Sequence, residues 1–281
     1  MQKERFIVIP NKKELDNYVK NGITSFILPL EDYSIGFDVY FSTKEINELS
    51  SKYNVYVMMN KFLHSKINTI HEDVFSKLDS NIKVMCEDIG LIEVIDPKRI
   101  VLYEHHILSN YQAINYLYKN DVVNVVINND LTIDEIKEIH SNTLSNLYYF
   151  YVAKNNLMYS RRNLVTNFDK NFDIEHEDKT YELSEKVSKN ILEVKEESDG
   201  SVIKNHKIFC ASKYLDEFRD INLIIDFSSI NDVSEGIILD NLDNVELYNL
   251  IDSDYYFLEN DIKYKVGDLK WNMSYYYLLE I

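Results

Sequence analysis

The sequence predicts an α/β fold in which strand–helix units close into a TIM-type barrel. Seven short apolar runs of strand type alternate with helical patterns, and helix-capping residues stand just after several strand exits. The chain of 281 residues is 45% hydrophobic, which suffices for one large core. Seven or eight such units most simply form a barrel, and an open doubly wound sheet is the alternative. The predicted strands are 5–10, 25–30, 55–59, 82–86, 99–103, 122–127 and 147–152.

Helices are predicted between these strands from N-cap signals and from apolar stripes at helical spacing. In a capping box, the residue that caps the helix is followed three positions later by Glu. Each of the two side chains accepts a hydrogen bond from the backbone amide of the other residue. The run 67–78 carries apolar residues on one face and predicts a further helix, as do 90–95 and 113–117. The predicted capping boxes are Asn11 with Glu14, Ser42 with Glu45, and Thr132 with Glu135.

The alternation stops after residue 172, where charged and polar residues dominate. We predict a β-hairpin insertion at about 172–206, with its turn at Asp199 and Gly200. The run 223–226 is then the eighth barrel strand, so the barrel domain spans 1–240. The remaining residues, 241–281, are rich in tyrosine and predict a small strand-containing extension packed on the barrel.

Composition excludes several classes of protein. With 30 basic and 47 acidic residues the formal charge is −17, which argues against a broad basic face for nucleic acid. No apolar run is long enough for a membrane helix, and the first residues lack a signal-peptide layout, so we expect a cytoplasmic protein. The two cysteines, Cys86 and Cys210, form no CxxC pair, and no glycine-rich phosphate loop is present.

Polar residues follow most of the predicted strands, where barrel enzymes carry their catalytic groups. We take Glu104, Asp88 and His106 as candidates for acid–base work. Carboxylates and histidines at one mouth also suit a divalent metal, but no ligand spacing such as HExxH occurs, so no metal site is predicted. The full set is Asn60, His64, Glu87, Asp88, Glu104, His105, His106, Asn129, Asp130, Arg161, Arg162 and Asp226.

The segment 147–167 carries the most distinctive pattern. An aromatic strand leads into Tyr159-Ser160-Arg161-Arg162, which contains two adjacent arginines, and the segment ends in Thr166-Asn167. It resembles the signature of the collagenase-like peptidases, peptidase family U32, in which a strand ending in Glu-x-x-x-His-Gly precedes Ser-Gly-Arg or Ser-Lys-Arg and a later Ser/Thr-Asn. Further agreement comes from Asn60-Lys61-x-x-His64, Asp88-x-Gly90, Asn110-Tyr111 with Ala113-Ile114-Asn115, and 133–136.

The chain departs from this family at positions that carry chemistry. Tyr148 stands for the motif glutamate, Val152 for its histidine, and Asn156 and Asn163 for its cysteines. Other departures are Ala153 for glycine, Asn129-Asp130 for Arg-Glu, Ile224 for lysine, and Phe227-Ser228 for Gly-Arg.

The resemblance implies a TIM-type barrel and one of two activities: peptide hydrolysis, or an accessory role in hydroxylating RNA or quinone precursors. Many accessory members bind an iron–sulfur cluster through four cysteines, and we expect none here. A valine cannot transfer a proton, so we expect a degenerate member that binds a partner, such as a paralogous subunit of the family. An active peptidase and an RNA-hydroxylation accessory protein are the alternatives. The predicted substrate-binding residues are Arg162, Arg161, Asn60, Ser160, Asn167 and Asp226.

Overall fold

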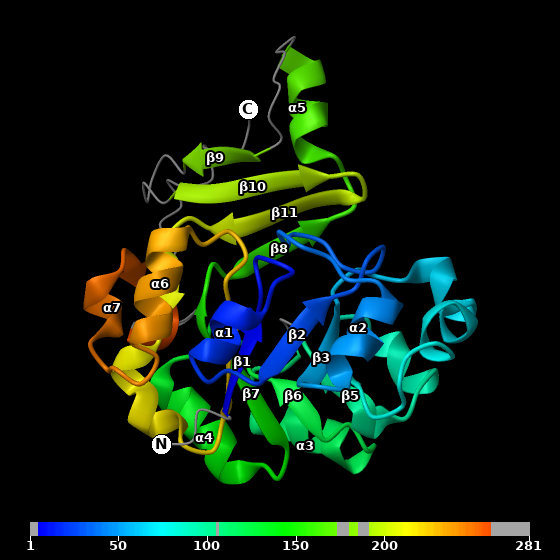
Figure 1. Cartoon of the computed structure of the whole chain (residues 1–281), viewed down its shortest axis with the longest axis horizontal. Helices are drawn as coiled ribbons and strands as arrows, with labels where there is room; N and C mark the ends of the chain where they lie inside the picture. Colours follow the sequence, from blue (N-terminus) through cyan, green and yellow to red (C-terminus); the bar gives the residue numbers. More distant parts are fainter. Residues whose placement is uncertain (1–4, 105–106, 173–179, 185–190, 260–281) are drawn as a thin grey trace, which may run out of the picture.

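Eight parallel strands form a closed barrel in the computed structural model, which describes residues 5–104, 107–172, 180–184 and 191–259 (Figure 1). The barrel closes because β13 pairs in parallel with both β1 and β7. The predicted TIM-type fold is therefore confirmed. Its strands are β1 (Phe6–Ile9), β2 (Ser25–Pro29), β3 (Asn54–Met59), β4 (Lys83–Cys86), β5 (Ile100–Leu102), β6 (Asn124–Val126), β7 (Asn146–Ala153) and β13 (Asn222–Asp226).

Helical segments cover the outside of the barrel. Two predicted capping boxes are present, Ser42 with Glu45 on α2 and Thr132 with Glu135 on α4. The α-helices are α1 (Asp16–Lys20), α2 (Thr43–Ser50), α3 (Tyr111–Lys119), α4 (Ile133–Asn142), α5 (Leu164–Phe172), α6 (Asp232–Asp240) and α7 (Leu247–Leu250). The short 3₁₀ segments are η2 (His64–Asn68), η4 (Ile89–Glu93), η5 (Pro97–Arg99), η6 (Ser212–Phe218) and η7 (Tyr256–Leu258), and η3 (His71–Phe75) is a π-helical turn.

Two expectations for the helical layer were wrong. The run 67–78 forms the turns η2 and η3 instead of one helix, although Val74 and Phe75 are still buried. No capping box forms at Asn11, because its side chain is held by tertiary contacts. Its Nδ2 donates to Glu235 Oε2 at 2.8 Å, and its Oδ1 accepts from the Tyr18 hydroxyl at 2.9 Å.

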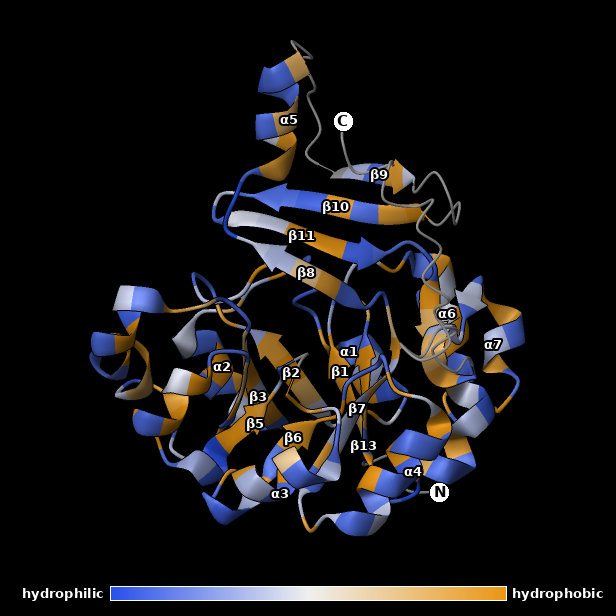
Figure 2. Cartoon of the chain, turned by 180° about the vertical axis from the view of Figure 1, so that it is seen from behind, coloured by the Kyte–Doolittle hydropathy of each residue, from blue (hydrophilic) through white to orange (hydrophobic). Residues whose placement is uncertain are grey.

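A four-stranded antiparallel sheet, which we call the cap sheet, lies over the C-terminal end of the barrel (Figure 1). Its strands, in order, are β8 (Asn156–Ser160), β11 (Gly200–Asn205), β10 (Ile191–Glu197) and β9 (Thr180–Ser184). The predicted hairpin at Asp199 and Gly200 joins β10 to β11, and Gly200 has a φ of +140°. Helix α5 projects from the cap sheet, away from the barrel (Figure 2).

The barrel has two apolar layers. One fills the interior, with Ile7, Met58 and Phe150 among its members, and the other lies between the strands and the helices. Beyond the barrel, β12 (Ile208–Cys210) pairs with β7, and β14 (Ser253–Asp254) pairs with β12. The predicted extension is described only to residue 259, so the tyrosine-rich segment near the C-terminus lies outside the described residues.

Candidate functional site

The barrel mouth beneath the cap sheet holds two buried carboxyl groups. Burial, together with the charge of Glu104, raises the pKa of Glu87 to about 8. Asp226, at the end of β13, accepts hydrogen bonds from the Ser228 backbone N–H at 2.8 Å and from its hydroxyl at 2.5 Å. Burial raises the pKa of Asp226 as well, although the charge of Lys204 opposes the rise.

Lys204, on β11 of the cap sheet, is also buried, and its charge acts on Asp226. Its Nζ donates to the carbonyl oxygen of Gly36 at 2.6 Å and lies 3.3 Å and 3.4 Å from the hydroxyl oxygens of Ser228 and Ser229. Burial lowers the pKa of Lys204, and Asp226 opposes that shift. Sequence reasoning missed Lys204, because one lysine in an alternating strand carries no signal that it is buried.

Packed side chains fill the space between the cap sheet and the barrel interior. The cavity that remains there measures about 10 Å³, and its wall includes Phe37, Met58, Tyr103, Phe150 and Ala153. That volume is at most the room for a single water molecule. This cavity, therefore, has no room for a substrate.

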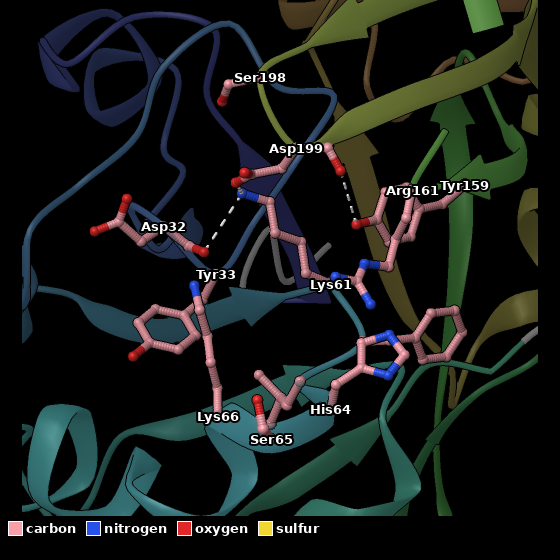
Figure 3. Close-up of a pocket in the computed structure, with 12 residues that line it drawn as sticks. Asp32, Tyr33, Lys61, His64, Ser65, Lys66, Tyr159, Arg161, Ser198 and Asp199 are labelled. Carbon is pink, nitrogen blue, oxygen red and sulfur yellow. Dashed lines mark hydrogen bonds and ion pairs between the residues drawn. The ribbon is translucent and has the colours of Figure 1, made fainter. Parts of the chain in front are cut away.

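The larger opening, which we call the rim pocket, lies at the edge of the barrel beside the β10–β11 turn (Figure 3). Its volume is about 330 Å³. It draws on the exits of β2 and β3 and on the end of β8, so segments far apart in sequence meet there. Its lining residues are Asp32, Tyr33, Lys61, Phe62, Leu63, His64, Ser65, Lys66, Tyr159, Arg161, Ser198 and Asp199.

Two of the predicted site residues build the frame of the rim pocket. The buried Asn60 side chain accepts from the backbone N–H of Ile35 at 2.9 Å and donates to its carbonyl at 3.0 Å. Asp88 accepts from the N–H of Leu63 at 2.9 Å and from the N–H of Gly90 at 2.9 Å. These bonds fix the loops after β2 and β3, so the agreement with Asn-Lys-x-x-His and Asp-x-Gly has a structural basis.

The rim pocket combines cations with aromatic rings. Lys61 Nζ lies 2.6 Å from Asp199 Oδ2, and this hydrogen bond lowers the pKa of Asp199. The rings of Phe62 and Tyr159 stack at 6.1 Å between centroids and 20° between planes. Lys66 Nζ lies 5.3 Å from the centroid of the Tyr33 ring. Sequence reasoning took Asp199 only as a turn residue and missed its ion pair with Lys61.

The two adjacent arginines have different surroundings. Arg161 lines the rim pocket (Figure 3), whereas Arg162 is exposed and is not among the lining residues. The backbone N–H of Arg162 donates to Ser160 Oγ at 3.2 Å, and its carbonyl accepts from Ser201 at 3.0 Å. Asn167 is exposed on α5, which projects away from the barrel. Substrate contacts by Arg162, Ser160, Asn167 and Asp226 stay predictions.

Two of the three acid–base candidates are described, and both bind backbone amides. Asp88 accepts from the N–H groups of Leu63 and Gly90, and Glu104 accepts from the N–H of Ile107 at 2.7 Å. His105 and His106 lie outside the described residues. Within the described ranges, no three residues of the His, Cys, Asp and Glu types are placed to hold a metal ion.

Two residues that stand at motif positions of the family are packed in the core of this chain. Tyr148 lies inside the barrel, with its hydroxyl 3.4 Å from that of Tyr56 and 3.3 Å from Lys83 Nζ. Val152 packs in the apolar layer outside the strands. Cys86 and Cys210 are buried on β4 and β12, and burial raises the pKa of both thiols. Two separated thiols do not fit a cluster that requires four cysteines.

Comparison with known proteins identifies the family of the chain. No curated protein and no solved structure matches it significantly. In the part of the chain that the structure describes, no helix is both long and apolar enough to cross a membrane. The family model of peptidase family U32 matches residues 11–227, which include every barrel strand except β1 in full. Because this model matches most of the length of the chain, the chain belongs to peptidase family U32.

Proposed function

We propose that this chain is a non-catalytic member of peptidase family U32 that works as a binding or accessory subunit. One observation carries the proposal: at the end of the barrel where barrel enzymes do chemistry, the cavity between the cap sheet and the barrel interior has room for at most one water molecule. A larger opening, the rim pocket, lies at the edge of the barrel. Tyr148 and Val152, at the positions of the motif glutamate and histidine, support the same conclusion because neither suits proton transfer at neutral pH.

A peptidase assay tests the absence of catalysis. The purified chain is incubated with gelatin and with a peptide library, beside a Glu87→Gln variant that removes the buried mouth carboxyl. We expect no hydrolysis above the buffer background for either protein. Hydrolysis by the wild type that Glu87→Gln abolishes would show an active site at the mouth and would contradict the proposal.

A binding assay tests the accessory role. We expect the native chain to co-purify with a partner, of which a paralogous subunit is the candidate. The double variant Lys61→Ala/Arg161→Ala should weaken that complex at least about tenfold, because two rim cations are lost. Lys137→Ala, on the exposed face of α4, is the matched control and should bind as the wild type does. A chain that stays monomeric and without a partner would count against the role.

The rim pocket favours a second candidate, an accessory role on RNA. Stacked rings beside cations are the usual means of holding a single nucleic-acid strand. Here Phe62 and Tyr159 form the stack, and Lys61, Lys66 and Arg161 surround it. We also propose that the chain carries no iron–sulfur cluster, since Asn156 and Asn163 replace the motif cysteines.

Fluorescence anisotropy with a labelled single-stranded RNA of about 12 nucleotides tests the RNA role. If about three phosphates are neutralised, log K should fall with log salt at a slope of about −2. Phe62→Ala should weaken binding about tenfold through lost stacking, whereas Phe172→Ala, an exposed aromatic on α5, should not. Equal binding by both variants would reject the rim pocket as the RNA site.

A further inference from the structure

A second hollow, which we call the asparagine pocket, lies on the barrel near the β6 exit and the start of β8. Its volume is about 70 Å³, which exceeds what one water molecule needs. It is lined from four segments: the exit of β6, the β7–β8 connection, the end of β11 and η7. Its lining residues are Tyr103, Asn128, Asn129, Asp130, Asn155, Asn156, Leu157, Asn205, Tyr256 and Phe257.

One buried polar atom of the asparagine pocket lacks a hydrogen-bond partner within the described chain. The Oδ1 atom of Asn156 is buried and accepts no hydrogen bond. Asn205 is only 7% exposed and lines the same hollow. A buried acceptor without a donor costs about 1–3 kcal/mol, so the Asn156 oxygen indicates that a ligand supplies a donor.

The free groups are mainly hydrogen-bond acceptors. Asn129 donates through Nδ2 to the Phe150 carbonyl at 3.0 Å, which leaves its Oδ1 as the free end. Asn156 Oδ1 is the second acceptor, and the exposed carboxylate of Asp130 is the third. No lysine or arginine is among the described lining residues, and nearby Lys154 is paired with Glu193 at 2.5 Å.

Aromatic rings complete the surroundings of these acceptors. Tyr103, Tyr256 and Phe257 line the same hollow. A planar cation gains from both features, because ring faces attract cations and charged donors bond strongly to carboxylate and amide oxygens. An anion would meet Asp130 and the −17 charge of the chain without any lining cation.

We propose that the asparagine pocket binds an alkylguanidinium group, as an arginine side chain carries, through Asn129, Asn156 and Asp130. The guanidinium group is planar and rich in donors, and its charge is weakly hydrated, so it fits a small hollow lined by acceptors and rings. Asn205 then bonds the edge of the bound group. This inference is independent of the rim pocket and of the proposed function.

Isothermal titration with N-acetyl-arginine amide tests the proposal, with the neutral isostere N-acetyl-citrulline amide as the matched ligand. We expect the arginine probe to bind at least about tenfold more tightly, because citrulline lacks the charge. Equal or tighter binding of citrulline would overturn the proposal, as would the absence of saturable binding by the arginine probe.

Variants locate the binding. Asp130→Asn keeps the shape of an exposed side chain and should weaken the arginine probe about fivefold, and Asn205→Leu should weaken it about tenfold. Asn142→Ala, on the exposed end of α4, should bind as the wild type does. Lys61→Ala/Arg161→Ala should also leave the affinity unchanged. Wild-type affinity in Asp130→Asn would reject the pocket, and so would a loss of affinity confined to the rim variant.

Discussion

Replacing Lys204 by methionine tests whether this buried cation holds the cap sheet on the barrel. Methionine keeps an unbranched side chain of similar length but removes the ammonium group. That group reaches the carbonyl of Gly36 and the hydroxyls of Ser228 and Ser229, which belong to the exits of β2 and β13. The substitution therefore removes the polar link between β11 and two strands of the barrel.

The expected cost follows from burial. Asp226 is 4% exposed and Lys204 is 2% exposed, and the charge of each favours the charged form of the other without a direct ion pair between them. Breaking a buried ion pair costs about 3–5 kcal/mol, so the lower end of that range applies to two charges that do not touch. The Gly36 carbonyl also loses its donor, whereas relief of the desolvated ammonium offsets part of the loss. We expect the free energy of unfolding to fall by about 3 kcal/mol.

Urea unfolding followed by circular dichroism measures this change. Lys195→Met is the matched control, since Lys195 lies on the same sheet but is 31% exposed, and it should cost less than about 1 kcal/mol. Adding Asp226→Asn to Lys204→Met removes the stranded charge and should recover at least about 1 kcal/mol. A Lys204→Met protein within about 1 kcal/mol of the wild type would refute the reasoning, and so would no recovery in the double variant.

Three further predictions concern Glu87, Asn60 and Ser42. The folded state raises the pKa of Glu87 from its ordinary 4.5 to about 8, so between these values the folded chain holds a proton that the unfolded chain has lost. This contribution to stability is complete below pH 4.5 and is lost as the pH rises to about 8. The free energy of unfolding should fall by up to about 1.4 kcal/mol per pH unit in this window. Urea titrations at several pH values measure the slope, and Glu87→Gln should remove it. Asn60→Ala should lower the free energy of unfolding by about 2–3 kcal/mol, because Ile35 loses both bonds, and calorimetry measures it. Ser42→Ala should cost about 1 kcal/mol through the lost cap of α2, and an equal melting temperature would contradict this.

Local patterns predicted the barrel because its strands and caps depend on near neighbours. The apolar runs around β1 to β7 and β13 are buried on both faces, as parallel strands require, and this makes them visible as continuous hydrophobic stretches. The pairs at Ser42 and Thr132 form boxes because nothing distant competes for their side chains. Asn11 has the same spacing, but Glu235 and Tyr18 take its side chain, and only the tertiary fold brings those partners near.

The candidate site was only partly predictable for the same reason. Asn60, Asp88 and Arg161 were identified from their positions after strands, and all three help to form or line the rim pocket. Lys66, Phe62 and the pairing of Asp199 with Lys61 were missed, because pocket membership depends on which loops meet. The same limit applies to Arg162, which sequence reasoning ranked above Arg161 and which the fold leaves outside that pocket.

The sequence by itself determined the strand order of a barrel, the family frame and the replacement of its histidine and cysteines by Val152, Asn156 and Asn163. These properties are written in short runs and single positions. The tertiary structure alone decided that the insertion and β8 form one sheet over the barrel mouth. It also decided that Lys204 is buried there and that the rim pocket forms where distant loops meet. Such outcomes depend on contacts between segments more than 100 residues apart, such as Gly36 and Lys204, which no local pattern encodes.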